Sequence, residues 1–175
     1  MTATLQEAYR FWQKNEDPYP THGGAIPVSP RATIASTLVK IGAADEDDCF
    51  SFASDVRSDV RDVGNPALLD KLMLSEEARQ RFLTGVGTGV LSPGLLSQAL
   101  QRSVPFEQNQ VDGICGLLGN RNPRIRYAAM AVLDTTYMTK DRMRRLAESM
   151  SSDNEAEIRD SALAILESRH PYSRV

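Results

Sequence analysis

Few residues in this sequence have the types and the spacing that catalysis or metal binding requires. It contains two histidines, His22 and His170, and neither has a second metal ligand at the tight spacing of a zinc site. The loop 17–27 is the best place for an enzyme site, with His22 as the base and Gly23 and Gly24 giving a substrate access to the backbone. An enzyme that uses this loop is one alternative for the function, although no catalytic residue is assigned.

Two other motifs that resemble functional sites have simpler structural explanations. Gly85, Gly87 and Gly89 fit neither the dinucleotide-binding nor the Walker pattern, and they predict a flexible connector between two helices. The acidic run 45–48 is typical of a first helical turn, where carboxylates meet the positive end of the helix dipole. We therefore expect a helix cap in place of a cation site, and neither a metal nor a cofactor.

Charge is distributed unevenly along the chain. Residues 45–62 hold seven acids and two arginines, a net charge of minus 5, whereas residues 121–145 hold seven basic residues and two acids, a net charge of plus 5. The basic stretch supports a second alternative, in which a groove binds nucleic acid or a phosphate ligand. The residues for that site are Arg121, Lys140, Arg142 and Arg145. The sequence pI near 5.4 argues against it.

Composition places the chain among ordinary soluble proteins, with 41% apolar and 25% charged residues. The sequence has no uninterrupted apolar run long enough for a membrane helix, and its N-terminus lacks the pattern of a secretion signal. Cys49 and Cys115 lie in apolar helical patterns, which is typical of buried thiols in a reducing compartment. We therefore expect a cytoplasmic location.

Helical periodicity and helix-capping signals run through most of the chain. Ser29 with Pro30 predicts a helix start, and Gly42 predicts its end. The next helix should run over 45–63 and end at Gly64, and Asn65 with Pro66 should start another. Further short helices are predicted at 75–83, 93–102 and 107–118, and the stretch 15–30 is a loop rich in proline and glycine.

An internal repeat organises the C-terminal third of the sequence. Residues 122–133 recur 33 positions later as residues 155–166, with one isoleucine–arginine step, two alanines and one leucine in common. Such self-similarity is the signature of stacked helical hairpins. The predicted fold is an all-α superhelix of about nine or ten helices in one domain, with an N-terminal helix and loop at 1–28, irregular hairpins at 29–104 and two repeats at 105–170.

The repeat resembles the HEAT (armadillo-type) family over about residues 107–168. The resemblance rests on an aliphatic residue followed by arginine, Ile125–Arg126 and again Ile158–Arg159, early in the second helix. It implies that the second helices line a concave face that binds other proteins. It also implies that Asp153 pairs with Arg126 of the neighbouring repeat, whereas Asn120 departs from the aspartate that the family has at this position.

The leading hypothesis for function is a non-catalytic module that binds a partner protein, as an adaptor, chaperone or inhibitor does. The contact surface should consist of side chains on the second helices that do not belong to the buried apolar face: Arg124, Tyr127, Met130, Asp134, Asp160 and Leu163. The polar last helix would cap the stack, so a monomer is expected.

Overall fold

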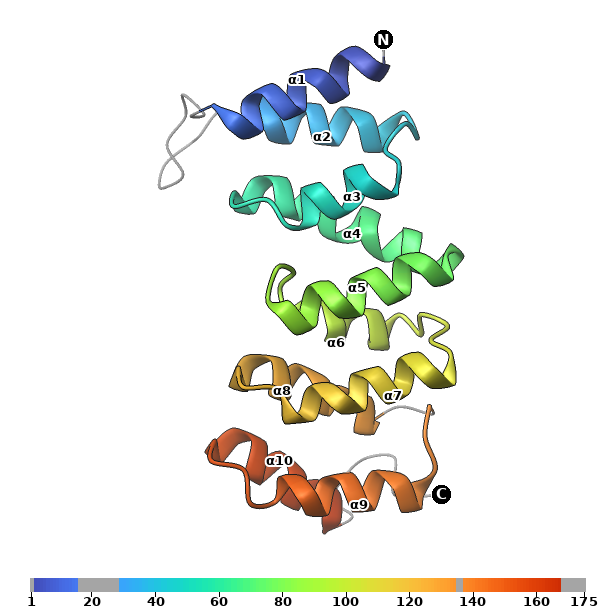
Figure 1. Cartoon of the computed structure of the whole chain (residues 1–175), viewed down its shortest axis with the longest axis vertical. Coiled ribbons are helices and arrows are strands. Elements are labelled where there is room, and N and C mark those ends of the chain that lie inside the picture. Colours follow the sequence, from blue (N-terminus) through green and yellow to red (C-terminus); the bar gives the residue numbers. More distant parts are fainter. Residues whose placement is uncertain (1, 16–28, 135–136, 168–175) are drawn as a thin grey trace. The chain divides into compact units, whose positions relative to one another are not determined.

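The computed structural model describes residues 2–15, 29–134 and 137–167, and it is all-α (Figure 1). These residues form ten α-helices and two short 3-10 helices, and no β-strand occurs among them. Within this described part, no helix combines the length and the apolar character needed to cross a lipid bilayer. The chain divides into two compact units, Met1–Ala78 and Arg79–Val175, which are described in turn.

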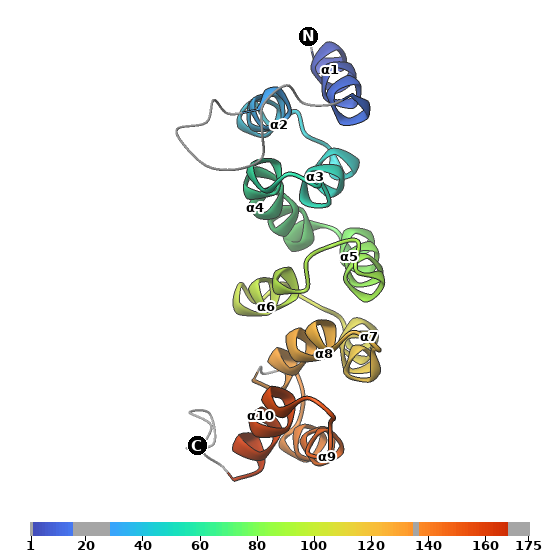
Figure 2. The same ribbon diagram turned by 90° about the vertical axis from the view of Figure 1, so that its left-hand side faces the viewer.

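Unit 1 consists of two helical hairpins whose second helices touch each other. Its helices are α1 (Thr2–Lys14), α2 (Pro30–Lys40), α3 (Glu46–Ala53) and α4 (Ser58–Leu74). Helix α1 packs on α2, α3 packs on α4, and α2 also contacts α4. In Figure 2, α2 and α4 therefore lie on one side of this unit and α1 and α3 on the other.

The predicted start and end of α2 and the predicted start of α3 are confirmed. The Ser29 hydroxyl accepts the Ala32 N–H at 3.1 Å, and Gly42 follows α2 with a φ of 69°, the left-handed conformation that glycine adopts without strain. Asp45 caps α3 by accepting the Asp48 N–H at 2.8 Å, and the Asp48 carboxylate accepts the Asp45 N–H in return. The acidic run at 45–48 thus serves as a capping box.

The predicted helix over 45–63 and the predicted helix start at 66 are wrong. Helix α3 ends at Ala53, and α4 continues through both Gly64 and Pro66. A Cβ atom on Gly64 would lie 2.4 Å from the Ala53 nitrogen, so this glycine allows α3 and α4 to touch backbone to backbone. Pro66 removes one helical hydrogen bond, and the three buried leucines that follow it in α4 offset that loss by packing.

Unit 2 repeats the hairpin arrangement three times. Its helices are α5 (Glu76–Thr88), which begins at the boundary of the units, α6 (Gly94–Gln101), α7 (Gln108–Gly116), α8 (Pro123–Met130), α9 (Lys140–Met150) and α10 (Ala156–Leu166), and the 3-10 helices are η1 (Leu117–Gly119) and η2 (Ala131–Asp134). Helix α8 contacts α6 on one side and α10 on the other. The second helices α6, α8 and α10 form one layer of this unit, and α5, α7 and α9 form the other (Figure 2).

The predicted flexible glycine connector is wrong. Helix α5 extends to Thr88, so Gly85 and Gly87 are helical and only Gly89, with a φ of 78°, lies in the turn. A Cβ atom on Gly85 would approach the Leu91 side chain to 2.9 Å. Gly85 therefore lets the turn pack closely against α5, and Leu91 is buried there.

Candidate interaction surface

An arginine–aspartate pair ties the turn before α8 to the turn before α10. Nε and NH2 of Arg126 donate to the two carboxylate oxygens of Asp153, each at 2.8 Å. The third nitrogen, NH1, donates to the carbonyl oxygens of Asn120 at 2.9 Å and Arg121 at 3.3 Å, in the turn that precedes α8. The predicted pairing of Arg126 with Asp153 is confirmed, and its role is to hold one hairpin to the next.

The electrostatics of this pair agree with a structural role. The hydrogen bonds from Arg126 hold the pKa of the Asp153 carboxyl below its usual value, and the same bonds raise the pKa of Arg126. Both groups therefore stay charged near neutral pH. Arg159 repeats half of the arrangement, since its NH1 donates to the carbonyl oxygens of Asp153 at 2.7 Å and Asn154 at 2.8 Å.

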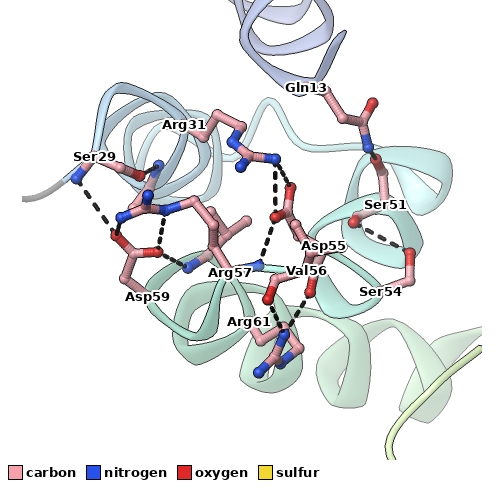
Figure 3. A network of polar contacts seen from close by, with 12 residues as sticks. Gln13, Ser29, Arg31, Ser51, Ser54, Asp55, Val56, Arg57, Asp59 and Arg61 are labelled. Atoms are coloured by element: carbon pink, nitrogen blue, oxygen red, sulfur yellow. Dashed lines mark hydrogen bonds and ion pairs between the residues drawn. The ribbon is translucent and has the colours of Figure 1, made fainter. Parts of the chain in front are cut away.

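Unit 1 contains a third copy of this turn, which the sequence analysis missed. NH1 of Arg61 donates to the carbonyl oxygens of Asp55 at 2.7 Å and Val56 at 2.8 Å (Figure 3). In all three copies the arginine reaches the carbonyls six and five residues before it. The turn before α4 is therefore built in the same way as the turns before α8 and α10.

We call this arrangement the turn bracket. It starts with an aspartate or asparagine whose side-chain oxygen accepts the N–H two residues later at 2.9 Å, and it ends with an aliphatic residue five positions on and an arginine six positions on. The aliphatic residue is buried in every copy. The three copies are Asp55–Val60–Arg61, Asn120–Ile125–Arg126 and Asp153–Ile158–Arg159. This spacing is the signal in the sequence that would have found the copy in unit 1.

The bracket in unit 1 is the centre of a buried polar network. The Asp55 carboxylate accepts hydrogen bonds from Arg31 NH1, at 3.1 Å to each oxygen (Figure 3), and from the Tyr9 hydroxyl at 2.8 Å. Burial and the bond to Asp55 both raise the pKa of Tyr9 above its usual range. Because its carboxylate is satisfied inside the protein, Asp55 joins α1, α2 and the turn before α4.

The adjoining ion pair has the same structural character. Arg57 donates through Nε and NH2 to the two oxygens of Asp59, each at 3.0 Å, and the Ser29 N–H points to the same carboxylate at 3.4 Å (Figure 3). Hydrogen bonding from Arg57 lowers the pKa of Asp59. The start of α2 is thus held to the start of α4.

These turns place α8 and α10 side by side with outward-facing side chains. Arg124 and Tyr127 are exposed on α8, and Asp160 and Leu163 are exposed on α10. Members of each pair are three residues apart and so share one side of their helix. Tyr127 is 51% exposed and Leu163 is 43% exposed, so both offer apolar area to a partner. We call these four residues the α8–α10 face.

Two of the six predicted contact residues do not belong to this face. Met130 is buried, so its predicted outward position is wrong. Met130 and Leu163 are equivalent positions of the repeat. In the layer of second helices, α8 contacts both α6 and α10, which covers Met130. Among the described helices of that layer, α10 contacts α8, which leaves Leu163 exposed. The backbone of Asp134 ends η2, and its side chain lies outside the described part of the structure.

The four basic residues proposed for a phosphate groove come from the turn before α8 and from α9. Arg121 lies in the turn before α8, whereas Lys140 is the first residue of α9. Arg142 is engaged by Asp112, with NH2 2.6 Å from the carboxylate, and Arg145 is exposed farther along α9. The phosphate-binding alternative therefore stays a prediction.

A shallow groove of about 310 Å³ lies between α5 and α7. Leu83 and Leu117 provide its apolar lining, and Thr84, Thr88 and Asn109 provide hydroxyl and amide groups. Both threonine hydroxyls donate to backbone carbonyls of α5 itself. The lining has no carboxylate, imidazole or thiol, so it provides no acid–base pair for catalysis.

The two histidines and the two cysteines are the remaining candidates for chemistry, and the structure describes only the cysteines. The loop 17–27 with His22, and also His170, lie outside the described residues. Cys49 is buried, as expected, and its burial raises the thiol pKa to about 11, whereas Cys115 is half-buried and both thiols are free.

Comparison with known proteins gives no assignment. No protein-family model matches this sequence, and searches of curated proteins and of solved structures find no significant match.

Proposed function

We propose that the chain is a non-catalytic protein-interaction module, built of stacked HEAT-like helical hairpins, that binds a partner through the α8–α10 face. The turn bracket carries the proposal. One device that recurs three times in 175 residues is expected of a repeat architecture, in which equivalent second helices lie side by side and present a shared surface. An adaptor, a chaperone and an inhibitor would all use such a surface.

The chemistry of the face supports protein binding. Tyrosine and arginine are enriched at the centres of protein interfaces, because each combines a large contact area with hydrogen bonding. Here Tyr127 and Leu163 supply apolar area, while Arg124 and Asp160 supply charges of opposite sign on neighbouring helices. A partner of mixed charge with an apolar centre would fit this pattern.

The test compares two double variants of the tagged protein. Arg124→Glu with Tyr127→Ala alters the face, and Arg145→Glu with Val90→Ala makes a similar change at exposed positions elsewhere in unit 2. We expect one stoichiometric protein partner to be recovered from the source cells by the wild type and by the control at low and high salt. The face variant should lose it about tenfold or more. Circular dichroism checks that both variants are folded.

Two outcomes would overturn the proposal. If the face variant retains the partner and the control loses it, the partner binds elsewhere. If no protein is recovered and nucleic acid is present only at low salt, the basic residues and not the face account for binding, because phosphate contacts weaken steeply with salt.

A further inference from the structure

The C-terminal end of α4, in unit 1, exposes two adjacent apolar side chains. Leu74 is 87% exposed and Met73 is 43% exposed, although Leu72 beside them is fully buried. Single exposed apolar residues are common, whereas two at one helix end add their apolar areas at one place, and we call Met73 and Leu74 the ridge. This ridge lies outside the α8–α10 face, which belongs to the other unit.

Two acidic side chains lie near this ridge. The Ser75 hydroxyl, directly after α4, donates to Glu46 at 3.3 Å and accepts the Ala78 N–H at 3.0 Å, so the end of α4 is fixed beside the first turn of α3. That turn follows the exposed cap residue Asp45. On α4 itself, Asp70 and Lys71 lie four and three residues before Leu74 and share its side of the helix; Asp70 is exposed and Lys71 is half-buried. We call Glu46, Asp70, Met73 and Leu74 the α4 tip.

The charge of unit 1 favours a basic partner at this tip. Residues 1–78 contain seven lysines and arginines and thirteen acids, a net charge of minus 6, whereas residues 79–175 contain thirteen basic residues and ten acids, a net charge of plus 3. An acidic field raises the local concentration of cationic segments and speeds their association. Apolar contact at the ridge would then hold the segment in place.

We propose that the α4 tip is a second docking site, which binds a basic amphipathic helix of a partner protein. The apolar side of that helix would cover Met73 and Leu74, and lysines or arginines along its edges would meet Glu46 and Asp70. The partner class follows from the tip itself: two adjacent apolar side chains need an apolar stripe, and acids from two helices need cations on its flanks.

The experiment measures binding of two labelled synthetic helices to the full chain by fluorescence anisotropy. One helix has a leucine stripe flanked by lysines, and the other has the same stripe flanked by glutamates. We expect the lysine helix to bind and the glutamate helix not to bind. Leu74→Ser should weaken binding of the lysine helix by about tenfold, the loss expected for one leucine that becomes buried in the complex. Asp70→Asn should weaken it less and reduce its salt dependence.

Val56→Ser is the matched control, because Val56 is 82% exposed and lies in the turn before α4, at the other end of that helix. If Leu74→Ser and Val56→Ser weaken binding equally, or neither weakens it, the lysine helix responds to diffuse charge and the proposal fails. If the lysine helix does not bind, and the wild type instead forms a dimer that Leu74→Ser abolishes, the tip binds a second copy of the chain and the proposal is again overturned. Both altered side chains are exposed, so neither variant should fail to fold.

Discussion

The substitution Asp153→Asn tests whether the turn bracket stabilises the stack. It keeps the shape of the side chain but removes the charge that accepts two 2.8 Å hydrogen bonds from Arg126. The two side chains are only 14% and 8% exposed, so the guanidinium would be left largely buried without its counter-ion. Removing one partner of a fully buried pair costs about 3–5 kcal/mol. Because this pair retains some solvent contact and asparagine still accepts one bond, we expect a loss of about 2 kcal/mol.

Urea unfolding gives this free energy directly, and thermal melting should show a decrease of about 4–8 °C for a chain of this size. Glu148→Gln is the control, because Glu148 pairs with Arg144 at 3.2 Å on the surface of α9, where the side chains are 52% and 75% exposed. Exposed pairs contribute about 0–1 kcal/mol. Equal effects of the two substitutions would refute the structural role of the Arg126–Asp153 pair.

The pH dependence of the same variant provides an independent measurement. Since Arg126 lowers the folded-state pKa of Asp153, the stability it contributes is present above the ordinary carboxyl pKa and is lost as pH falls through the lowered value. The difference in unfolding free energy between wild type and Asp153→Asn should therefore be largest near neutral pH and shrink in acid. A difference that stays constant in acid would mean that the charge of Asp153 is not what stabilises the turn.

Three further predictions concern the core and the thiols. Gly64→Ala should lower the free energy of unfolding by about 3 kcal/mol, because its Cβ would overlap the backbone of α3. Gly116→Ala has open space around it and should raise that free energy by about 0.5–1 kcal/mol. If urea unfolding shows Gly116→Ala to be the less stable of the two variants, this reasoning is contradicted. Tyr9→Phe removes a buried hydroxyl and should cost about 1–2 kcal/mol in the same assay, and no measurable loss would argue against the network. A disulfide reagent at about pH 8 should modify Cys115 faster than the buried Cys49, and faster modification of Cys49 would show that α3 opens readily.

The features that the sequence predicted correctly are those that depend on neighbouring residues. The cap at Ser29, the capping box at Asp45 and the stop at Gly42 each involve partners within a few positions, so spacing alone identifies them. The Arg126–Asp153 pair links residues 27 positions apart, and it was expected because the resemblance of the repeat to the HEAT family implies such a pair between neighbouring hairpins. Local chemistry and the family resemblance of the repeat were therefore the two reliable signals.

The errors occurred where a distant part of the chain determines the local structure. Gly64 has the sequence context of a helix stop, but contact with the backbone of α3 places it inside α4. Met130 has the register of an outward residue, but α8 is covered from both sides. The turn bracket at Arg61 was missed because the sequence of α3 and α4 lacks the rest of the repeat pattern, although Asp55, Val60 and Arg61 have the correct spacing.

The bracket also separates the residues that support folding from those available for binding. In each copy the aliphatic residue is buried and the arginine is bonded to its own turn, so these positions are committed to the structure. The next residue along the helix is exposed in all three copies, and it is Asp62 in α4, Tyr127 in α8 and Asp160 in α10. Substitutions there remove little buried area and should change stability by less than about 0.5 kcal/mol. The identity of this one residue can therefore vary between repeats without loss of the fold. The contrast between Tyr127 and its two acidic counterparts is the reason to expect the partner of unit 2 to be centred on α8.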